Sequence, residues 1–137
     1  MRTVQRIIEE RGGIERLREH AIALENPPYM RLCIEHIGTG PRGLPMVSVC
    51  HYGQQNGDAM RAPDLVCEVA TDGLQGWRWL PVSFRNDYLG VDQEACFTDE
   101  QGRIMIRPAL VRDLASFART WDGNIREQGF AMVRATA

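Results

Sequence analysis

The hydrophobic period of the chain changes near Tyr29, and this change is what most constrains the fold. From Tyr29 to Ile106, apolar residues recur at every second position in short segments separated by turn sequences. Period two is typical of strands that bury one face. We therefore expect strands at residues 30–35, 44–52, 65–70 and 77–84, followed by a hairpin with arms at 94–98 and 103–106.

The strand at 77–84 has a distinctive face pattern. Trp77 and Trp79 fall on one face, and the other face carries Leu80, Val82 and Phe84. Pro81 interrupts this pattern because it lacks a backbone N–H for the ladder. We therefore expect this strand to be an edge strand or to contain a bulge.

Helical periodicity flanks the strand region. Two short helices are predicted, Thr3–Arg11 and Ile14–His20, separated at two glycines that would cost about 2 kcal/mol inside one helix. Pro108 is a favourable first-turn residue and opens a long helix that ends near Gly129. Its apolar stripe comprises Leu110, Leu114, Phe117, Trp121 and Ile125. The expected fold is α+β: a single domain (1–137) with a mainly antiparallel sheet, short N-terminal helices and a long C-terminal helix packed on the sheet.

Composition excludes several functional classes. The chain of 137 residues has a formal net charge of -2, and its sixteen basic residues are scattered arginines. Nucleic-acid-binding domains usually carry a clustered basic patch, so we expect no nucleic-acid partner. No segment approaches the ~18 apolar residues of a membrane span, and no apolar signal segment opens the chain. We expect a cytoplasmic protein whose four cysteines (Cys33, Cys50, Cys67 and Cys96) are reduced, mostly buried thiols.

The most unusual stretch is a polar segment, His51 to Pro63, which we expect to form a loop between two strands. Its Asn56-Gly57 pair is a strong turn signal, so a purely structural role is one interpretation. A metal or acid–base site is a second, because the residue types suit a cation: His51, Asp58 and Asp64, with Glu68 as a further ligand. A recognition loop is the third, with binding residues His51, Tyr52, Gln55, Asn56, Asp58 and Arg61.

The aromatic residues Trp77, Trp79 and Tyr88 allow two interpretations. The tryptophans can cover the sheet beneath the C-terminal helix, since aromatic residues dominate core burial. If their face is exposed instead, Arg85 would join them in an aromatic–arginine patch, which is the composition of interface hot spots. Trp77, Trp79 and Arg85 are therefore further binding candidates.

Nucleophilic catalysis finds little support in the sequence. There is no Gly-x-Ser-x-Gly motif, and Cys50 and His51 are adjacent strand residues whose side chains should point to opposite faces. The glycine-rich segment 38–43 lacks the Gly-Lys-Ser/Thr of a phosphate loop and leads into a strand. We predict no catalytic residue, no metal ligand and no cofactor.

Several short motifs carry a family resemblance. They are Tyr29-Met30, Val49-Cys50-His51-Tyr52, Gln55-Asn56-Gly57-Asp58, Met60-Arg61, Ser83-Phe84-Arg85-Asn86-Asp87, Tyr88-Leu89-Gly90 and Arg126-Glu127-Gln128. Together they resemble DUF6908, a bacterial domain of unknown function whose members resemble cargo of plasmids, integrative elements and phages. The resemblance implies no known activity. Where family members tend to have a Glu before the Asn-Gly-Asp, this chain has Gln54-Gln55, which weakens a catalytic role there.

The absence of a complete catalytic constellation favours a non-enzymatic protein-interaction module. The family resemblance implies that a mobile genetic element carries the module, and that its concrete form is an inhibitor of a host defence system, either restriction or CRISPR machinery. The alternative is a small metal-dependent enzyme that uses His51 and Asp58. We expect a protein partner, no membrane association, and a homodimer as a further option, formed through a sheet edge or the tryptophan face.

Overall fold

The computed structural model describes residues 1–134. Its main element is a six-stranded antiparallel sheet in the order β1-β2-β3-β4-β5-β6, so every strand lies beside its neighbours in sequence. The strands are β1 (Ile22–Leu24), β2 (Arg31–Thr39), β3 (Pro45–Gln55), β4 (Asp58–Ala70), β5 (Arg78–Asn86) and β6 (Val91–Glu94). The mainly antiparallel sheet predicted from the period-two pattern is confirmed.

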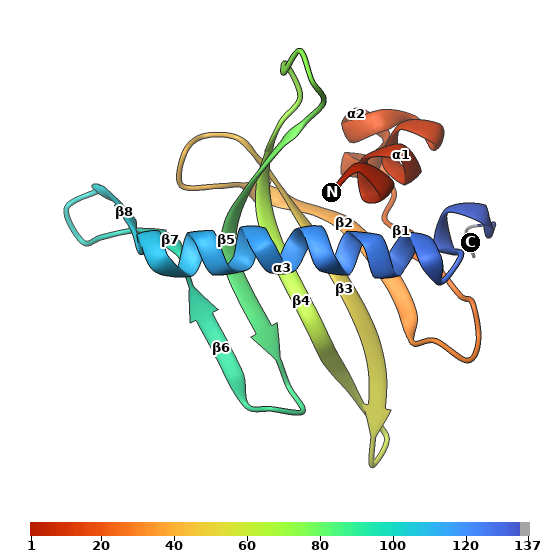
Figure 1. Cartoon of the computed structure of the whole chain (residues 1–137). Helices are drawn as coiled ribbons and strands as arrows, with labels where there is room; N and C mark the ends of the chain where they lie inside the picture. The colour runs from red at the N-terminus through yellow and green to blue at the C-terminus, as the bar shows by residue number, and fades with distance from the viewer. Residues whose placement is uncertain (135–137) are drawn as a thin grey trace.

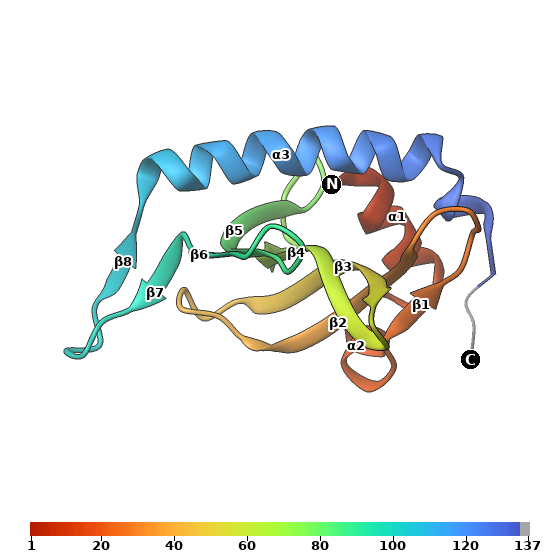
Figure 2. The same ribbon diagram turned by 90° about the horizontal axis from the view of Figure 1, so that it is seen from below.

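Helices precede and follow the sheet. They are α1 (Arg2–Glu10), α2 (Gly13–Glu19), α3 (Pro108–Glu127) and the short 3-10 helix η1 (Phe130–Met132). A two-stranded hairpin of β7 (Cys96–Thr98) and β8 (Ile104–Ile106) connects the sheet to α3. Figure 1 shows α3 running across the sheet, and Figure 2 shows that it covers one face. The predicted α+β fold is therefore confirmed, and no helix within residues 1–134 is long and apolar enough to cross a membrane.

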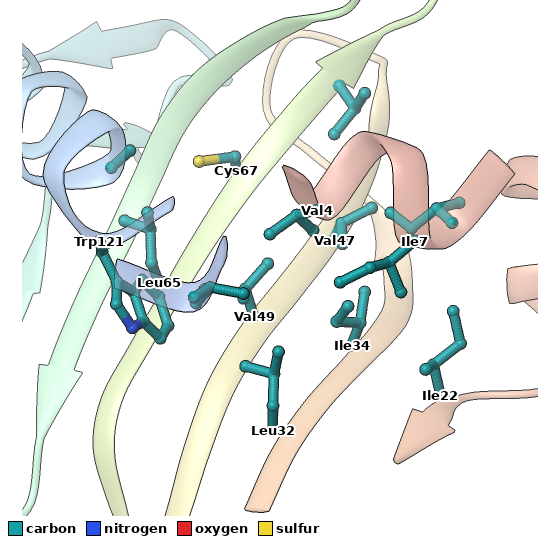
Figure 3. Close-up of a cluster of buried hydrophobic side chains, with 14 of the residues drawn as sticks. Val4, Ile7, Ile22, Leu32, Ile34, Val47, Val49, Leu65, Cys67 and Trp121 are labelled. Carbon is teal, nitrogen blue, oxygen red and sulfur yellow. The ribbon is translucent and has the colours of Figure 1, made fainter. Parts of the chain in front are cut away.

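The core lies between the sheet and the layer formed by α1 and α3. Figure 3 shows side chains from both helices meeting those of β2, β3 and β4. Val4 and Ile7 of α1 are fully buried in one cluster with Val47 and Leu65, and Trp121 of α3 belongs to the same cluster. Burying one such aliphatic side chain contributes roughly 1.5–3 kcal/mol, so this layer accounts for much of the stability of the fold.

The two helices of this layer are joined by one carboxylate. Asp122 of α3 is buried and accepts hydrogen bonds from the backbone N–H groups of Thr3 and Val4, each at 3.1 Å. The first N–H groups of a helix have no partner within the helix itself. A side chain of the last long helix therefore caps the first helix.

The segment His51–Pro63 is not a loop, as the sequence suggested, but a β-hairpin. Strand β3 continues to Gln55, and β4 begins at Asp58. Asn56 and Gly57 have φ values of 53° and 83°, which are the positive values a two-residue type I′ turn requires. The polar composition was misleading because residues 54–59 are exposed at the tip, where no buried face imposes a period of two.

Strand β5 contains the irregularity that Pro81 indicated, and it is a bulge. Cys67 pairs with Pro81 whereas Val66 pairs with Ser83, so Val82 is an extra residue in β5. An extra residue reverses the alternation of faces beyond it. The expectation that Phe84 faces away from the tryptophans is therefore wrong: Phe84 packs edge-on against Phe117 of α3, with ring centroids 5.2 Å apart.

Candidate functional site

The sheet face that points away from α3 carries a polar pocket of about 280 Å³. Asp64 pairs in register with Cys50 of β3 and Arg85 of β5, so these side chains share that face. We call this cavity the open-face pocket, and five strands supply its lining: Glu35, Ile37, Ser48, Tyr52, Arg61, Asp64, Val66, Ser83, Arg85 and Asp92.

Asp64 is a buried carboxyl at the floor of the open-face pocket. Its side chain accepts a 2.6 Å hydrogen bond from the Ser48 hydroxyl, and the Arg61 guanidinium lies 3.4 Å away. Burial raises the pKa of Asp64, and the Ser48 hydrogen bond and the positive charge of Arg61 oppose this rise only in part. A carboxyl group with a raised pKa inside a cavity is a common feature of functional sites.

Asp87, just after β5, holds both arginines of the pocket in place. Its carboxylate accepts hydrogen bonds from the Arg61 backbone N–H at 2.8 Å and from Arg85 Nε at 2.6 Å. The Asp87 N–H in turn donates to the Arg61 carbonyl at 2.7 Å. The Arg61 backbone hydrogen bond and the Arg85 contact lower the pKa of Asp87. The backbone of Arg61 and the guanidinium of Arg85 are therefore fixed before any ligand arrives.

The arrangement suits recognition of a polar surface. Two guanidinium groups face the open-face pocket alongside three carboxyl groups, those of Glu35, Asp64 and Asp92. Charged groups of both signs can pair with a partner that presents the opposite pattern. No group of three or more His, Cys, Asp or Glu residues able to hold a metal ion occurs within residues 1–134.

The comparison with protein families gives a match over almost the whole chain. A family model described as a domain of unknown function, DUF6908, matches residues 2–131. The chain belongs to the DUF6908 family. No curated protein and no solved structure matches it. All residues that line the open-face pocket lie inside the matched span of the DUF6908 domain.

The binding residues predicted from the sequence of this DUF6908 domain separate into several groups. Tyr52, Arg61 and Arg85 come together in the open-face pocket. Gln55, Asn56 and Asp58 lie at the exposed tip of the β3–β4 hairpin. The remaining three, His51, Trp77 and Trp79, lie elsewhere, so the predicted residues do not form one surface.

His51 is buried on the helix-covered face. Its ring lies 5.5 Å from the rings of both Trp121 and Phe130, and Nδ1 is 3.0 Å from the Met30 carbonyl oxygen. Burial lowers the pKa of His51. Asp58 pairs with Gln55, and Gln55 lies four positions after His51 in β3. Asp58 is therefore roughly 13 Å from His51 along the strand direction. The structure therefore does not bring His51 and Asp58 to a common metal, which needs ligands at ~2–2.5 Å.

Glu68, the further ligand of the metal interpretation, already has protein partners. It is fully buried and accepts hydrogen bonds from the backbone N–H groups of Arg42 and Leu44 and from Arg42 Nη1. Gly40 lies so close that a Cβ there would overlap the Glu68 side chain. Glu68 therefore anchors the β2–β3 turn of the DUF6908 domain.

Trp77 and Trp79 lie on the helix-covered face and pack against the core, as the first interpretation of the aromatic residues expected. Their ring centroids are 6.2 Å apart, and the backbone N–H of Trp77 donates to the side-chain oxygen of Gln5 in α1. Arg85 points to the opposite face, into the open-face pocket. The aromatic–arginine patch considered from the sequence therefore does not form.

Sequence reasoning missed part of the open-face pocket. Ser48 and Ser83 were not considered as binding residues, and Asp64 was considered only as a metal ligand. The role of Asp87 in positioning the arginines was not predicted. A signal for the pocket exists in the sequence: Ser48 lies between Val47 and Val49 in one strand, and Asp64 precedes Leu65 in the next, so each polar residue falls on the face opposite an apolar neighbour. Polar residues with that spacing indicate a sheet face directed at solvent.

Proposed function

We propose that this chain is a non-enzymatic protein-interaction module that binds its partner through the open-face pocket. The observation that carries the proposal is a set of charged groups of both signs on the sheet face that points away from α3, where hydrogen bonds hold the backbone of Arg61 and the side chains of Asp64 and Arg85. Groups that are already ordered lose little conformational entropy when a partner binds. Arg and Tyr, both present in this pocket, are enriched at protein interfaces.

We further propose that the module is bacterial, belongs to a mobile genetic element and acts in the cytoplasm on a host defence system. Support for this part comes from family context, since DUF6908 members resemble cargo of plasmids, integrative elements and phages. An inhibitor of restriction or CRISPR machinery must bind a protein that itself binds nucleic acid. The carboxyl groups of Glu35, Asp64 and Asp92 would pair with the basic side chains of such a protein.

A pull-down with the tagged full chain tests the interaction. Lysate from a bacterial host with defined restriction and CRISPR systems is compared for wild type, Arg85→Ala and a matched control, Arg112→Ala. Arg112 is exposed on α3, outside the open-face pocket. We expect wild type and Arg112→Ala to recover the same stoichiometric defence component, identified by mass spectrometry. Arg85→Ala should bind it at least about tenfold more weakly, because truncating a hot-spot residue costs ~2 kcal/mol or more and arginine is enriched among hot spots.

A plating assay tests the biological part separately. Cells that carry the defence system and express wild type should admit phage that control cells restrict, and Arg85→Ala should restore restriction. Unchanged restriction in cells that express folded wild type would contradict the host-defence proposal. Equal partner recovery by Arg85→Ala and Arg112→Ala would contradict the open-face pocket as the binding surface.

A further inference from the structure

Strand β8 is an exposed apolar strand that lies apart from the core. Figures 1 and 2 show the β7–β8 hairpin extending beyond the six-stranded sheet at the start of α3. Every residue from Glu100 to Ala109 is exposed. Three consecutive apolar side chains lie in this run, with exposed fractions of 51% for Ile104, 40% for Met105 and 48% for Ile106. An exposed apolar edge strand is a template for pairing with another chain.

The backbone of β8 directs alternate groups away from β7. The Arg103 carbonyl accepts from the Asp99 N–H at 2.9 Å, and the Arg107 N–H donates to the Ala95 carbonyl at 2.8 Å. Positions whose backbone groups bond to the neighbouring strand alternate along an antiparallel pair. The backbone N–H and C=O groups of Met105 therefore point toward β7, like those of Arg103 and Arg107. The N–H and C=O groups of Ile104 and Ile106 therefore point to the outer edge.

Strand β6 is protected at its edge, and β8 is not. Exposed Asp92 and Glu94 place negative charges along β6, which discourage pairing with another strand. The centre of β8 is Ile-Met-Ile, without a charge. Of these two strands, β8 is the one open to strand addition.

We propose that the occupant of this edge is a second copy of the chain, paired β8 to β8 in antiparallel orientation about a two-fold axis at Met105. The segment Arg103-Ile104-Met105-Ile106-Arg107 reads the same in both directions. Two-fold pairing therefore places Ile104 opposite Ile106 of the partner subunit, and these are the residues whose backbone groups point outward. Met105 meets Met105 of the partner subunit at the position where opposed side chains are closest. The interface is isologous and closes at two copies.

The arginines at the ends of β8 are held by their own chain. Arg103 forms an ion pair with Asp99 at 2.8 Å. Arg107 donates to the Glu94 carbonyl at 2.6 Å and lies over the Phe97 ring, with 4.8 Å from Cζ to the ring centroid. Two-fold pairing brings Arg103 near Arg107 of the partner subunit, and these contacts reduce the resulting repulsion. Screening by added salt should strengthen the dimer.

Sedimentation equilibrium of the full chain tests the proposal. A single strand pair is smaller than the interfaces of permanent dimers, so the mass should depend on concentration. It should rise from the 15.5 kDa of the monomer toward twice that value. Ile104→Lys and Ile106→Glu should each raise the dimer dissociation constant at least about tenfold, because each places a charge opposite an isoleucine. The matched control is Leu89→Lys, at an exposed leucine in the β5–β6 turn, and it should leave the dissociation constant unchanged.

Mixing the two charged variants tests the register itself. In the two-fold arrangement, the lysine introduced at 104 in one copy meets the glutamate introduced at 106 in the other. An equimolar mixture of Ile104→Lys and Ile106→Glu should therefore regain the dimer that each variant alone has lost. A wild-type chain that stays monomeric up to ~1 mM overturns the proposal, because at that concentration even a dimer with a dissociation constant of ~1 mM would be detected. A dimer insensitive to both substitutions, or a mixture without recovery, overturns it equally.

Discussion

Asp64 and Glu68 are buried carboxyl groups on the same strand, and they are used differently. Glu68 receives hydrogen bonds from two backbone N–H groups and one guanidinium, so its acceptors are satisfied by the fold. Asp64 receives one short hydrogen bond from Ser48 and a longer contact from Arg61, beside a cavity. A carboxyl group with spare acceptor capacity next to a cavity can bind a further donor, whereas a saturated one supports the local backbone.

The raised pKa of Asp64 leads to a prediction about pH. The carboxyl group of Asp64 binds its proton more tightly in the folded protein than in the unfolded chain. Its contribution to stability is therefore fully present below the unfolded pKa, near 3.8. That contribution is lost as pH rises through the higher pKa of the folded state. We expect the unfolding free energy of wild type to include a decrease with rising pH that comes from Asp64. The Asp64→Asn variant should lack this decrease. Urea titrations from pH 4 to pH 8 measure both.

Asp58→Asn is the matched control for Asp64→Asn, because Asp58 is exposed at the hairpin tip. It should keep the wild-type pH profile. If the difference in unfolding free energy between wild type and Asp64→Asn did not change with pH, the raised pKa would be contradicted.

At the scale of elements, α1 depends on α3 for its N-terminal cap. The two N–H groups that Asp122 accepts belong to Thr3 and Val4 in the first turn of α1. Asp122→Ala would leave these groups without that acceptor. We expect the free energy of unfolding to fall by about 1–3 kcal/mol, the range for a lost cap or an unsatisfied buried donor. Denaturant unfolding followed by circular dichroism measures the change.

Asp113→Ala, at an exposed position on the same helix, is the control for helix propensity and charge. Surface substitutions of this kind usually change stability by no more than ~0.5 kcal/mol. Equal destabilisation by Asp113→Ala and Asp122→Ala would show that Asp122 has no capping role.

The helices could be predicted from the sequence to within one or two residues, because Pro108 and the Gly12-Gly13 pair are local signals. The strand faces were less accessible. Pro81 indicated an edge strand or a bulge, but the hydrophobic period did not show that Val82 is the extra residue whose insertion reverses the alternation of β5. Tyr52 and Arg61 were found through the polar segment His51 to Pro63 and Arg85 through the proposed aromatic–arginine patch, whereas the central position of Asp64 depends on the pairing of β3, β4 and β5.

At the scale of the whole molecule, His51 joins the sheet to the C-terminal elements. Its ring contacts Trp121 of α3 and Phe130 of η1. Burial lowers the pKa of His51 in the folded protein. The stability that comes from neutral His51 is therefore present above the unfolded pKa of about 6.5. It is lost as pH falls through the lower pKa of the folded state. This pH dependence is opposite in sign to that of Asp64.

We expect wild type to lose stability as pH falls below about 6.5 and His51→Phe to lose less, because the ring contacts remain and no proton can bind. Thermal unfolding between pH 5 and pH 8, followed by tryptophan fluorescence and circular dichroism together, measures the loss for the whole fold. His20→Phe, at an exposed histidine, should retain the wild-type pH dependence. Parallel profiles for wild type and His51→Phe would rule out His51 as the source.

The order of the elements has a consequence during synthesis. Each strand of the sheet pairs with its neighbours in sequence, so the ladder can grow as the chain leaves the ribosome. The long helix that covers part of its apolar face begins only at Pro108, and the cap of α1 comes from Asp122, 119 residues after Thr3. A nascent chain that has completed the sheet therefore exposes the part of this face that α3 covers to chaperones and to other nascent chains until α3 emerges. Ribosome-bound chains stalled before Pro108 should accordingly be the species that aggregate.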